Sequence, residues 1–225
     1  MNRPVLIAAC LCVSIVLASG CSRDGGGGNG GDGESMTKAP KMFEVPGDAA
    51  DAGCVASSYT EQEPLHLETG DEKRDGYTSD PPTTGAHWPL WPRWGLYDEQ
   101  IQDEYAVHSL EHGGNVIWYG DVGDEVTATL PGLAEDEPKI VTSPRDGLDG
   151  LAATAWQQLL VCPQKAVDTL GADAVGDLLG EWIDKTGSTG SSAEKDAPAQ
   201  APPMSEFDSL PDQPPGPAID TTLEG

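Results

Sequence analysis

Histidine side chains gather in one window of the sequence. The chain has four histidines, and all of them lie between positions 66 and 112. Eight of its eleven tryptophans and tyrosines fall in the overlapping window from Tyr77 to Tyr119. A lone histidine is most simply a hydrogen-bonded structural residue. A group confined in this way predicts a shared metal ion instead, because imidazole binds copper, zinc, nickel and iron. The candidate metal ligands are His66, His87, His108 and His112.

Two of these histidines, His108 and His112, stand four positions apart. On a helix they would project from one face about 5–6 Å apart, close enough to share an ion. On an extended segment they would also share a face, because side chains alternate with a period of two. The helix favours a direct chelate, and Gly113 and Gly114 would end it before a strand.

The segment from His108 to His112 also matches the H-x-x-E-H pattern of a class of zinc proteases, with Glu111 as general base. The pattern is short, and no downstream helix offers an acidic ligand. Three histidines with an open position suit hydrolysis, whereas four histidines close the coordination sphere and suit binding or storage. We favour the second alternative, with no catalytic residue. Glu111 would then orient a ligand, and Tyr77 and Asp80 would be further oxygen donors beside the loop.

Prolines and tryptophans dominate the stretch from Thr78 to Asp98, which carries His87. Four prolines in this stretch exclude a regular helix or a central strand. We therefore expect a long loop whose indole rings pack onto the domain. Long ordered loops inside compact domains are often functional.

Regular elements are expected after this loop. Apolar runs predict strands at Val116–Tyr119 and Lys139–Thr142. The segment Ala152–Val161 fits a strand or a helix, and we favour a strand. The segment Glu125–Ala134 is a weak helix candidate broken near Pro131.

Apolar residues recur at helical spacing from Gln164 to Lys185 and predict a final helix. Gly171 and Gly176 would soften or break its first half. The expected fold class is therefore α+β, a single small domain with a few-stranded sheet, a C-terminal helix and the long Pro/Trp-rich loop. The domain would span residues 42–186.

The first twenty residues have the pattern of a secretion signal. Arg3 precedes the apolar run Val5–Leu17, which is shorter than the about 20 residues of a membrane-spanning helix. Small residues then lead directly into Cys21, an arrangement similar to the acylation site of bacterial lipoproteins. Cys10 follows similar residues but leaves too short an apolar segment upstream. The simpler alternative is ordinary secretion with Cys21 left free.

Both ends of the chain have the composition of unstructured segments. A Gly-rich tether is expected at residues 21–41, and a Pro-rich acidic tail at residues 187–225. The 38 acidic and 12 basic residues give a formal charge of -26. A surface this negative repels nucleic acid and anionic lipid, fits an extracytoplasmic or salt-adapted protein, and attracts cations.

Two cysteines remain once Cys10, Cys12 and Cys21 are assigned to the signal peptide and the anchor. In an oxidising compartment an even pair predicts one disulfide, between Cys54 and Cys162. It would tie the start of the domain to a late strand. A role as soft metal ligands is the weaker alternative, because neither cysteine belongs to a C-x-x-C motif.

Three motifs resemble one bacterial family. They are Tyr77–Pro89 (YTSDPPTTGAHWP), Gly95–Asp98 (GLYD) and Val107–Gly114 (VHSLEHGG). Together they resemble the domain of unknown function family 3105, whose members are typically exported or membrane-tethered. Thr84 stands where that family usually has serine. The resemblance runs from about His66 to Tyr119 and is looser over Ala152–Lys185.

The resemblance implies a domain but no established activity. It carries four positions over to this chain, His87, His108, Glu111 and His112, whereas His66 rests on the clustering alone. We expect a lipid-anchored, extracytoplasmic domain of the cell envelope that binds copper or zinc. Its partner is the membrane, with no nucleic acid, and the sequence identifies no protein partner. The alternatives are a metal-dependent hydrolase with Glu111 as base, and a metal-free interaction or scaffold domain.

Overall fold

The computed structural model describes residues 42–68, 76–136 and 139–187. The signal peptide, Cys21, the tether and residues 188–225 of the tail lie outside the described residues, so those expectations stay predictions. Within the described ranges, no helix combines the length and the apolar character needed to cross a membrane.

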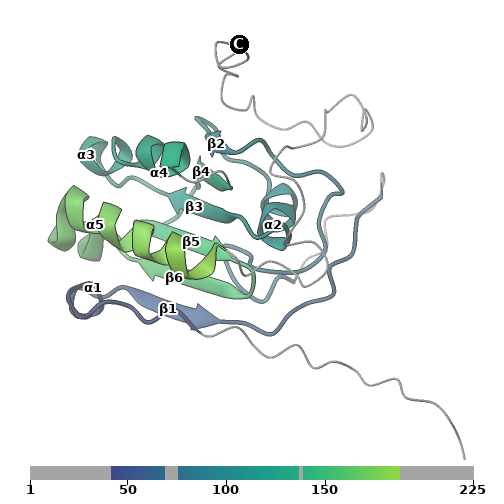
Figure 1. Cartoon of the computed structure of the whole chain (residues 1–225), viewed down its shortest axis with the longest axis horizontal. Coiled ribbons are helices and arrows are strands. Elements are labelled where there is room, and N and C mark those ends of the chain that lie inside the picture. Colours follow the sequence, from purple (N-terminus) through teal and green to yellow (C-terminus); the bar gives the residue numbers. More distant parts are fainter. Residues whose placement is uncertain (1–41, 69–75, 137–138, 188–225) are drawn as a thin grey trace, which may run out of the picture. The chain divides into compact units, whose positions relative to one another are not determined.

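A mixed six-stranded sheet forms the centre of the domain, with the strand order β1-β6-β5-β3-β4-β2 (Figure 1). The pairs β1–β6, β6–β5 and β5–β3 are antiparallel, whereas the pairs β3–β4 and β4–β2 are parallel. The α+β class expected from the sequence is therefore confirmed. The strands are β1 (Val55–Ser58), β2 (Gly95–Leu96), β3 (Asn115–Tyr119), β4 (Ile140–Pro144), β5 (Leu151–Ala155) and β6 (Gln158–Cys162).

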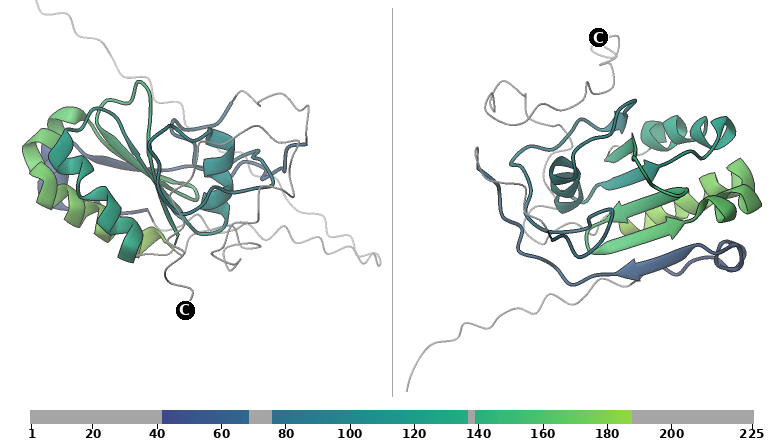
Figure 2. Two further views of the ribbon diagram at one scale, coloured as in Figure 1. Left: turned by 90° about the horizontal axis from the view of Figure 1, so that it is seen from above. Right: turned by 180° about the vertical axis from the view of Figure 1, so that it is seen from behind.

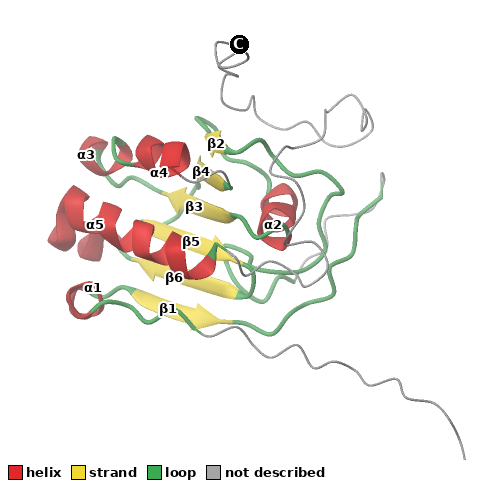
Figure 3. Ribbon diagram, viewed as in Figure 1, coloured by secondary structure: helices red, strands yellow, loops and turns green. Residues whose placement is uncertain are grey.

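Helices cover both faces of this sheet (Figures 2 and 3). Seen along the edge of the sheet, α2 lies on one side, and α3, α4 and α5 lie on the other. Alternating side chains explain both layers, since Ile117 of β3 packs under α5 while Val116 and Trp118 pack under α2. The helices are α1 (Gly47–Ala52), α2 (Asp103–Glu111), α3 (Asp124–Thr127), α4 (Leu130–Asp136) and α5 (Gln164–Thr186).

Of the two glycines expected to soften or break the first half of the last helix, α5, only Gly171 interrupts it. Gly171 has φ 75° and ψ 171°, a conformation essentially confined to glycine, and it interrupts α5 in its first half. Gly176 stays helical. The end of α5 is fixed by a buried amide, because the Trp182 indole N–H and the Thr186 hydroxyl both donate to Asn115 Oδ1, at 2.7 and 2.9 Å.

Three predicted elements have different boundaries in the structure. The segment Ala152–Val161 is not one strand, because a tight turn with Gln157 at φ 64° separates β5 from β6. The single helix expected at Glu125–Ala134 is two short helices, α3 and α4, and Pro131 lies in the first turn of α4, where its missing N–H costs nothing. The loop from Thr78 to Asp98 is irregular except for the two residues of β2 and an isolated bridge at His87.

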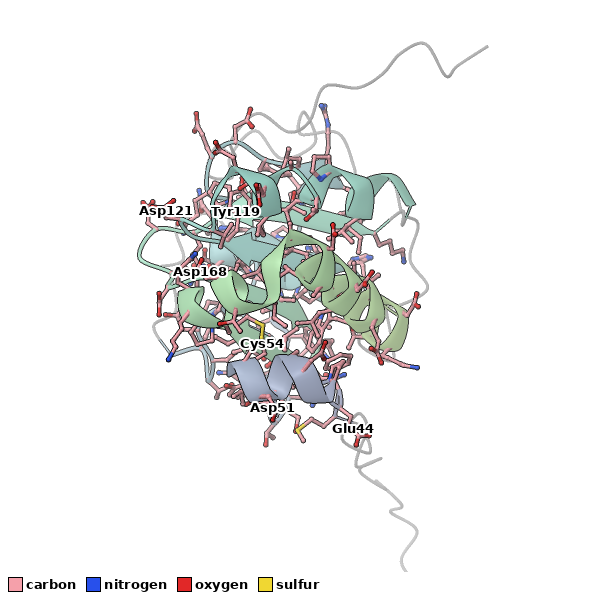
Figure 4. All side chains as sticks on the ribbon, turned by 90° about the vertical axis from the view of Figure 1, so that its left-hand side faces the viewer. Glu44, Asp51, Cys54, Tyr119, Asp121 and Asp168 are labelled. Atoms are coloured by element: carbon pink, nitrogen blue, oxygen red, sulfur yellow. A yellow bond between two sulfur atoms is a disulfide. The ribbon has the colours of Figure 1, made fainter. Side chains whose placement is uncertain are left out.

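The predicted disulfide between Cys54 and Cys162 is present and is visible below α5 in Figure 4. It joins the residue before β1 to the last residue of β6, and both cysteines are buried in the core beneath α5. The bond therefore clamps the edge strand β1, which pairs with β6 alone, to the rest of the sheet.

Candidate metal centre

Helix α2 carries the predicted H-x-x-E-H segment and turns it away from the sheet. Its residues Ala106, Val107 and Leu110 pack on the core beneath it. A helix repeats every 3.6 residues, so His108 falls on the opposite face, against Trp88 and Trp91 of the Pro/Trp-rich loop, and Glu111 lies at the border between the two faces. The segment that carries His108 and Glu111 is therefore helical, the conformation that favours a direct metal chelate.

The expected glycine ending of α2 is also confirmed. The N–H of Gly114 donates to Ser109 O at 2.9 Å, and the N–H of Gly113 donates to Leu110 O at 3.0 Å. Gly113 has φ 77°, so the pair forms a Schellman ending. A Cβ on Gly114 would lie 2.7 Å from the Trp94 ring, so this close packing requires glycine. The C-terminal turn that holds Glu111 is therefore tightly fixed.

The other two histidines come from paired extended segments. His66 and His87 face each other across an isolated parallel bridge. The N–H of Leu67 donates to His87 O at 2.8 Å, and the N–H of His87 donates to Leu65 O at 2.9 Å. The bridge therefore places His66 beside His87, although the two residues are far apart in the sequence.

Three histidines and one glutamate converge on one point. One ligand atom from each of four residues lies within 4.8 Å of the other three, and these residues are His66, His87, His108 and Glu111. The ring centroids are 4.7 Å apart for His87 and His108, and about 5 Å from each of them to His66. The clustering in sequence is therefore a clustering in space.

Backbone carbonyls set the tautomers of the two buried rings. His87 Nδ1 lies 2.8 Å from Gly85 O, and His108 Nδ1 lies 2.6 Å from Trp88 O. A carbonyl only accepts, so each Nδ1 carries the proton and donates. In the neutral rings both Nε2 atoms then hold a lone pair, which is the arrangement that metal-binding histidines show.

The Nε2 atom of His87 lies 3.0 Å from Glu111 Oε2, with both side chains buried. Among the described residues, neither atom has a hydrogen-bond partner. If His87 is neutral, its Nε2 lone pair and the carboxylate oxygen repel each other at this distance, and a shared proton or a metal cation removes the repulsion. The donor set therefore fits a bound metal ion.

Burial keeps two of the imidazoles neutral. Burial, followed by the neighbouring His87 and His112, lowers the pKa of His108 to about 2, against the hydrogen bond to Trp88. Burial outweighs the opposing effect of the Glu111 carboxylate and lowers the pKa of His112 to about 4. Neutral imidazole is the form that binds metal.

The structure places His112 beside the four-donor group and outside it. Its ring stacks on Trp91 at 4.1 Å between centroids and lies 4.7 Å from the His108 ring. Its backbone carbonyl accepts a hydrogen bond from Lys139 Nζ at 2.9 Å. Glu111, expected to act only by orienting a ligand, takes the fourth place instead. The i, i+3 spacing of His108 and Glu111 on a helix was the signal for this.

The two other expected oxygen donors have partners of their own. The Tyr77 hydroxyl donates to Ala86 O at 2.7 Å, and burial, followed by Glu104 and Asp103, raises the pKa of Tyr77. The Asp80 carboxylate forms an ion pair with Arg145 at the surface. Neither oxygen belongs to the four-donor group.

Comparison with known proteins gives one match. The family described as "Protein of unknown function (DUF3105)" matches residues 69–184, more than half of the 225 residues. The chain belongs to this family. Three of the four donors, His87, His108 and Glu111, lie within the matched range, and His66 precedes it. No curated protein and no solved structure matches the chain.

Proposed function

We propose that this DUF3105 domain binds one divalent transition metal ion, Zn²⁺ or Cu²⁺, through His66, His87, His108 and Glu111. The observation that carries the proposal is the buried contact of 3.0 Å between His87 Nε2 and Glu111 Oε2, which lacks a hydrogen bond. A cation bound to both atoms turns this repulsion into two coordination bonds.

The size of the group suits a tetrahedral ion after a small contraction. Ligands at about 2.0–2.2 Å from zinc lie about 3.4 Å from one another. The present upper separation of 4.8 Å therefore requires shifts of about 1 Å, within reach of side-chain rotation.

The chemistry of the donors favours the divalent ions of the two expected metals over Cu⁺. Three imidazoles and a carboxylate suit Zn²⁺ and Cu²⁺, whereas Cu⁺ prefers thiolate and thioether sulfur. The cysteines of the domain are joined in a disulfide, so they offer no thiolate to an ion.

A binding or storage role fits better than hydrolysis. Four protein ligands close a tetrahedral sphere, and a Glu111 carboxylate bound to the ion is not available as a general base. Histidines more than about 10 Å apart would favour the scaffold alternative, because no single ion could reach them. The three rings of His66, His87 and His108 lie about 5 Å from one another instead.

We further propose that the domain works on the extracytoplasmic face of a membrane, held by acylated Cys21. The support is the signal-like run before Cys21 and the Gly-rich stretch after it. Replacing Cys21 with serine should move the protein from the membrane fraction to the soluble fraction. An unchanged distribution would contradict the anchor.

The metal proposal is tested on the purified chain loaded with zinc and then dialysed. We expect one equivalent of zinc to remain, and His108→Ala to weaken binding by about a hundred-fold or more, the upper end of what residues supporting a metal site cost. Near-ultraviolet circular dichroism would establish that the variant is folded. Wild-type protein that retains less than one equivalent contradicts the proposal.

A further inference from the structure

The four donors of the proposed site differ in exposure. His87, His108 and Glu111 expose only 0%, 2% and 4% of their surfaces, whereas His66 is exposed. An ion held by all four would therefore be enclosed by protein except on the side of His66. An ion or small molecule that enters the site reaches it from that side.

The ring of His66 is also the least restrained of the three. The hydrogen bonds that fix its segment run through the backbone of Leu65 and Leu67, so its imidazole can turn without breaking them. The rings of His87 and His108 are each held at Nδ1 by a buried carbonyl. Turning either of them away breaks that hydrogen bond and leaves a buried carbonyl unpaired.

We infer that His66 is an exchangeable ligand that opens and closes one coordination position of the metal. This inference rests on the proposed metal site. With His66 turned out, the ion keeps His87, His108 and Glu111, a His₂Glu set with one vacant position toward solvent. Three-ligand sets of this kind hold water or a substrate atom in the fourth place.

The charge of the opened site indicates which kind of small ligand binds at the vacant coordination position. A divalent ion and the Glu111 carboxylate leave one positive charge, so a small neutral nitrogen base or a small anion fits the vacant position. Exposed Glu63 and Glu68 lie two or three residues from His66 in sequence and attract cations toward this side. The domain would thus receive an ion and present it to a small monodentate ligand through the same opening.

The test uses Co²⁺ in place of zinc, because tetrahedral Co²⁺ absorbs strongly in the visible range, and imidazole as the small ligand. His66→Ala should bind one Co²⁺ about ten- to a hundred-fold more weakly than wild type, and millimolar imidazole should restore both the affinity and the tetrahedral spectrum. His87→Ala is the matched buried control. Imidazole should restore little in it, because protein encloses that position. His66→Gln serves as a second variant at the exposed position.

The outcomes separate the two proposals. Wild-type protein that binds no Co²⁺ contradicts the metal site itself. If wild type binds Co²⁺ but imidazole restores neither His66 variant, His66 is not exchangeable. Equal restoration of His66→Ala and His87→Ala overturns the inference as well, because exposure would then not distinguish the ligands.

Discussion

The buried contact between His87 and Glu111 has two possible origins at the scale of single residues. A doubly protonated His87 could pair with the carboxylate, but its Nε2–H would then point at Oε2 and form a hydrogen bond. The atoms are 3.0 Å apart without that geometry. The two atoms therefore lie close together with no hydrogen bond between them, at about the separation of two ligands of one cation.

Glu111 and His112 are neighbours in sequence with opposite expected roles. Glu111→Gln removes the charged donor, and we expect zinc affinity to fall by about ten-fold or more. His112→Phe keeps a ring against Trp91 and should change zinc affinity by less than about three-fold. Competition with a chromophoric chelator measures both. Greater loss in His112→Phe than in Glu111→Gln would show that His112 is the ligand.

The buried imidazoles also predict how stability depends on pH in the metal-free protein. Burial lowers the pKa of His108 to about 2 and that of His112 to about 4, from 6.5 in an unfolded chain. Below pH 6.5 the unfolded state therefore binds more protons than the folded state, so stability is lost as the pH falls.

Urea unfolding with a chelator present, at about pH 7.5 and about pH 5, measures this loss. The loss should be smaller in His112→Phe, which has one fewer imidazole to protonate on unfolding. Equal losses in the variant and the wild type would rule out a contribution from His112.

At the scale of elements, the site lies between a helix and a loop. Helix α2 is held on the sheet by its apolar face and is ended by Gly113 and Gly114. The loop is held by a small core of its own, made of Leu67, Trp88, Leu90 and Tyr105. Because Tyr105 belongs to α2, this core joins the loop to the helix and fixes the donors relative to one another.

The two glycines of α5 should respond oppositely to alanine. Gly171→Ala places a Cβ in a conformation essentially confined to glycine and should destabilise the domain by about 1–3 kcal/mol. Gly176 is helical, with nothing within 4 Å of a Cβ, so Gly176→Ala should stabilise by up to about 1 kcal/mol. Urea midpoints measure both. Destabilisation by Gly176→Ala would show that α5 has no room there.

On the scale of the whole molecule, the two faces of the sheet support different parts of the protein. The face under α5 holds the larger core and the disulfide, while the face under α2 supports the proposed metal site. The Cys54–Cys162 bond closes a separation of 108 residues in the chain. A bond that closes so long a loop mainly restricts the unfolded chain.

Replacing both cysteines with alanine should therefore lower the free energy of unfolding by about 2–5 kcal/mol. The zinc affinity of the folded variant should be unchanged, because the bond lies across the sheet from the donors. Urea unfolding and chelator competition measure the two quantities. A parallel loss of affinity would show that the two faces are coupled.

Local patterns were sufficient for much of this domain. The α+β class, the strands at Val116–Tyr119 and Lys139–Thr142, the final helix and the disulfide follow from periodicity and cysteine number, and each is confirmed. The turn between β5 and β6 was missed, because Gln157 adopts a positive φ that glycine or asparagine would normally signal.

Sequence alone determined that the histidines belong together, because their confinement to one window needs no fold to be visible. Which side chains form the candidate site depends on the fold. The bridge between His66 and His87 and the direction of α2 are long-range features, set by packing on the sheet. They bring Glu111 into the group of donors and leave His112 stacked on Trp91. Spacing of four residues permits a chelate, but the position of the opposing loop selects the ligands.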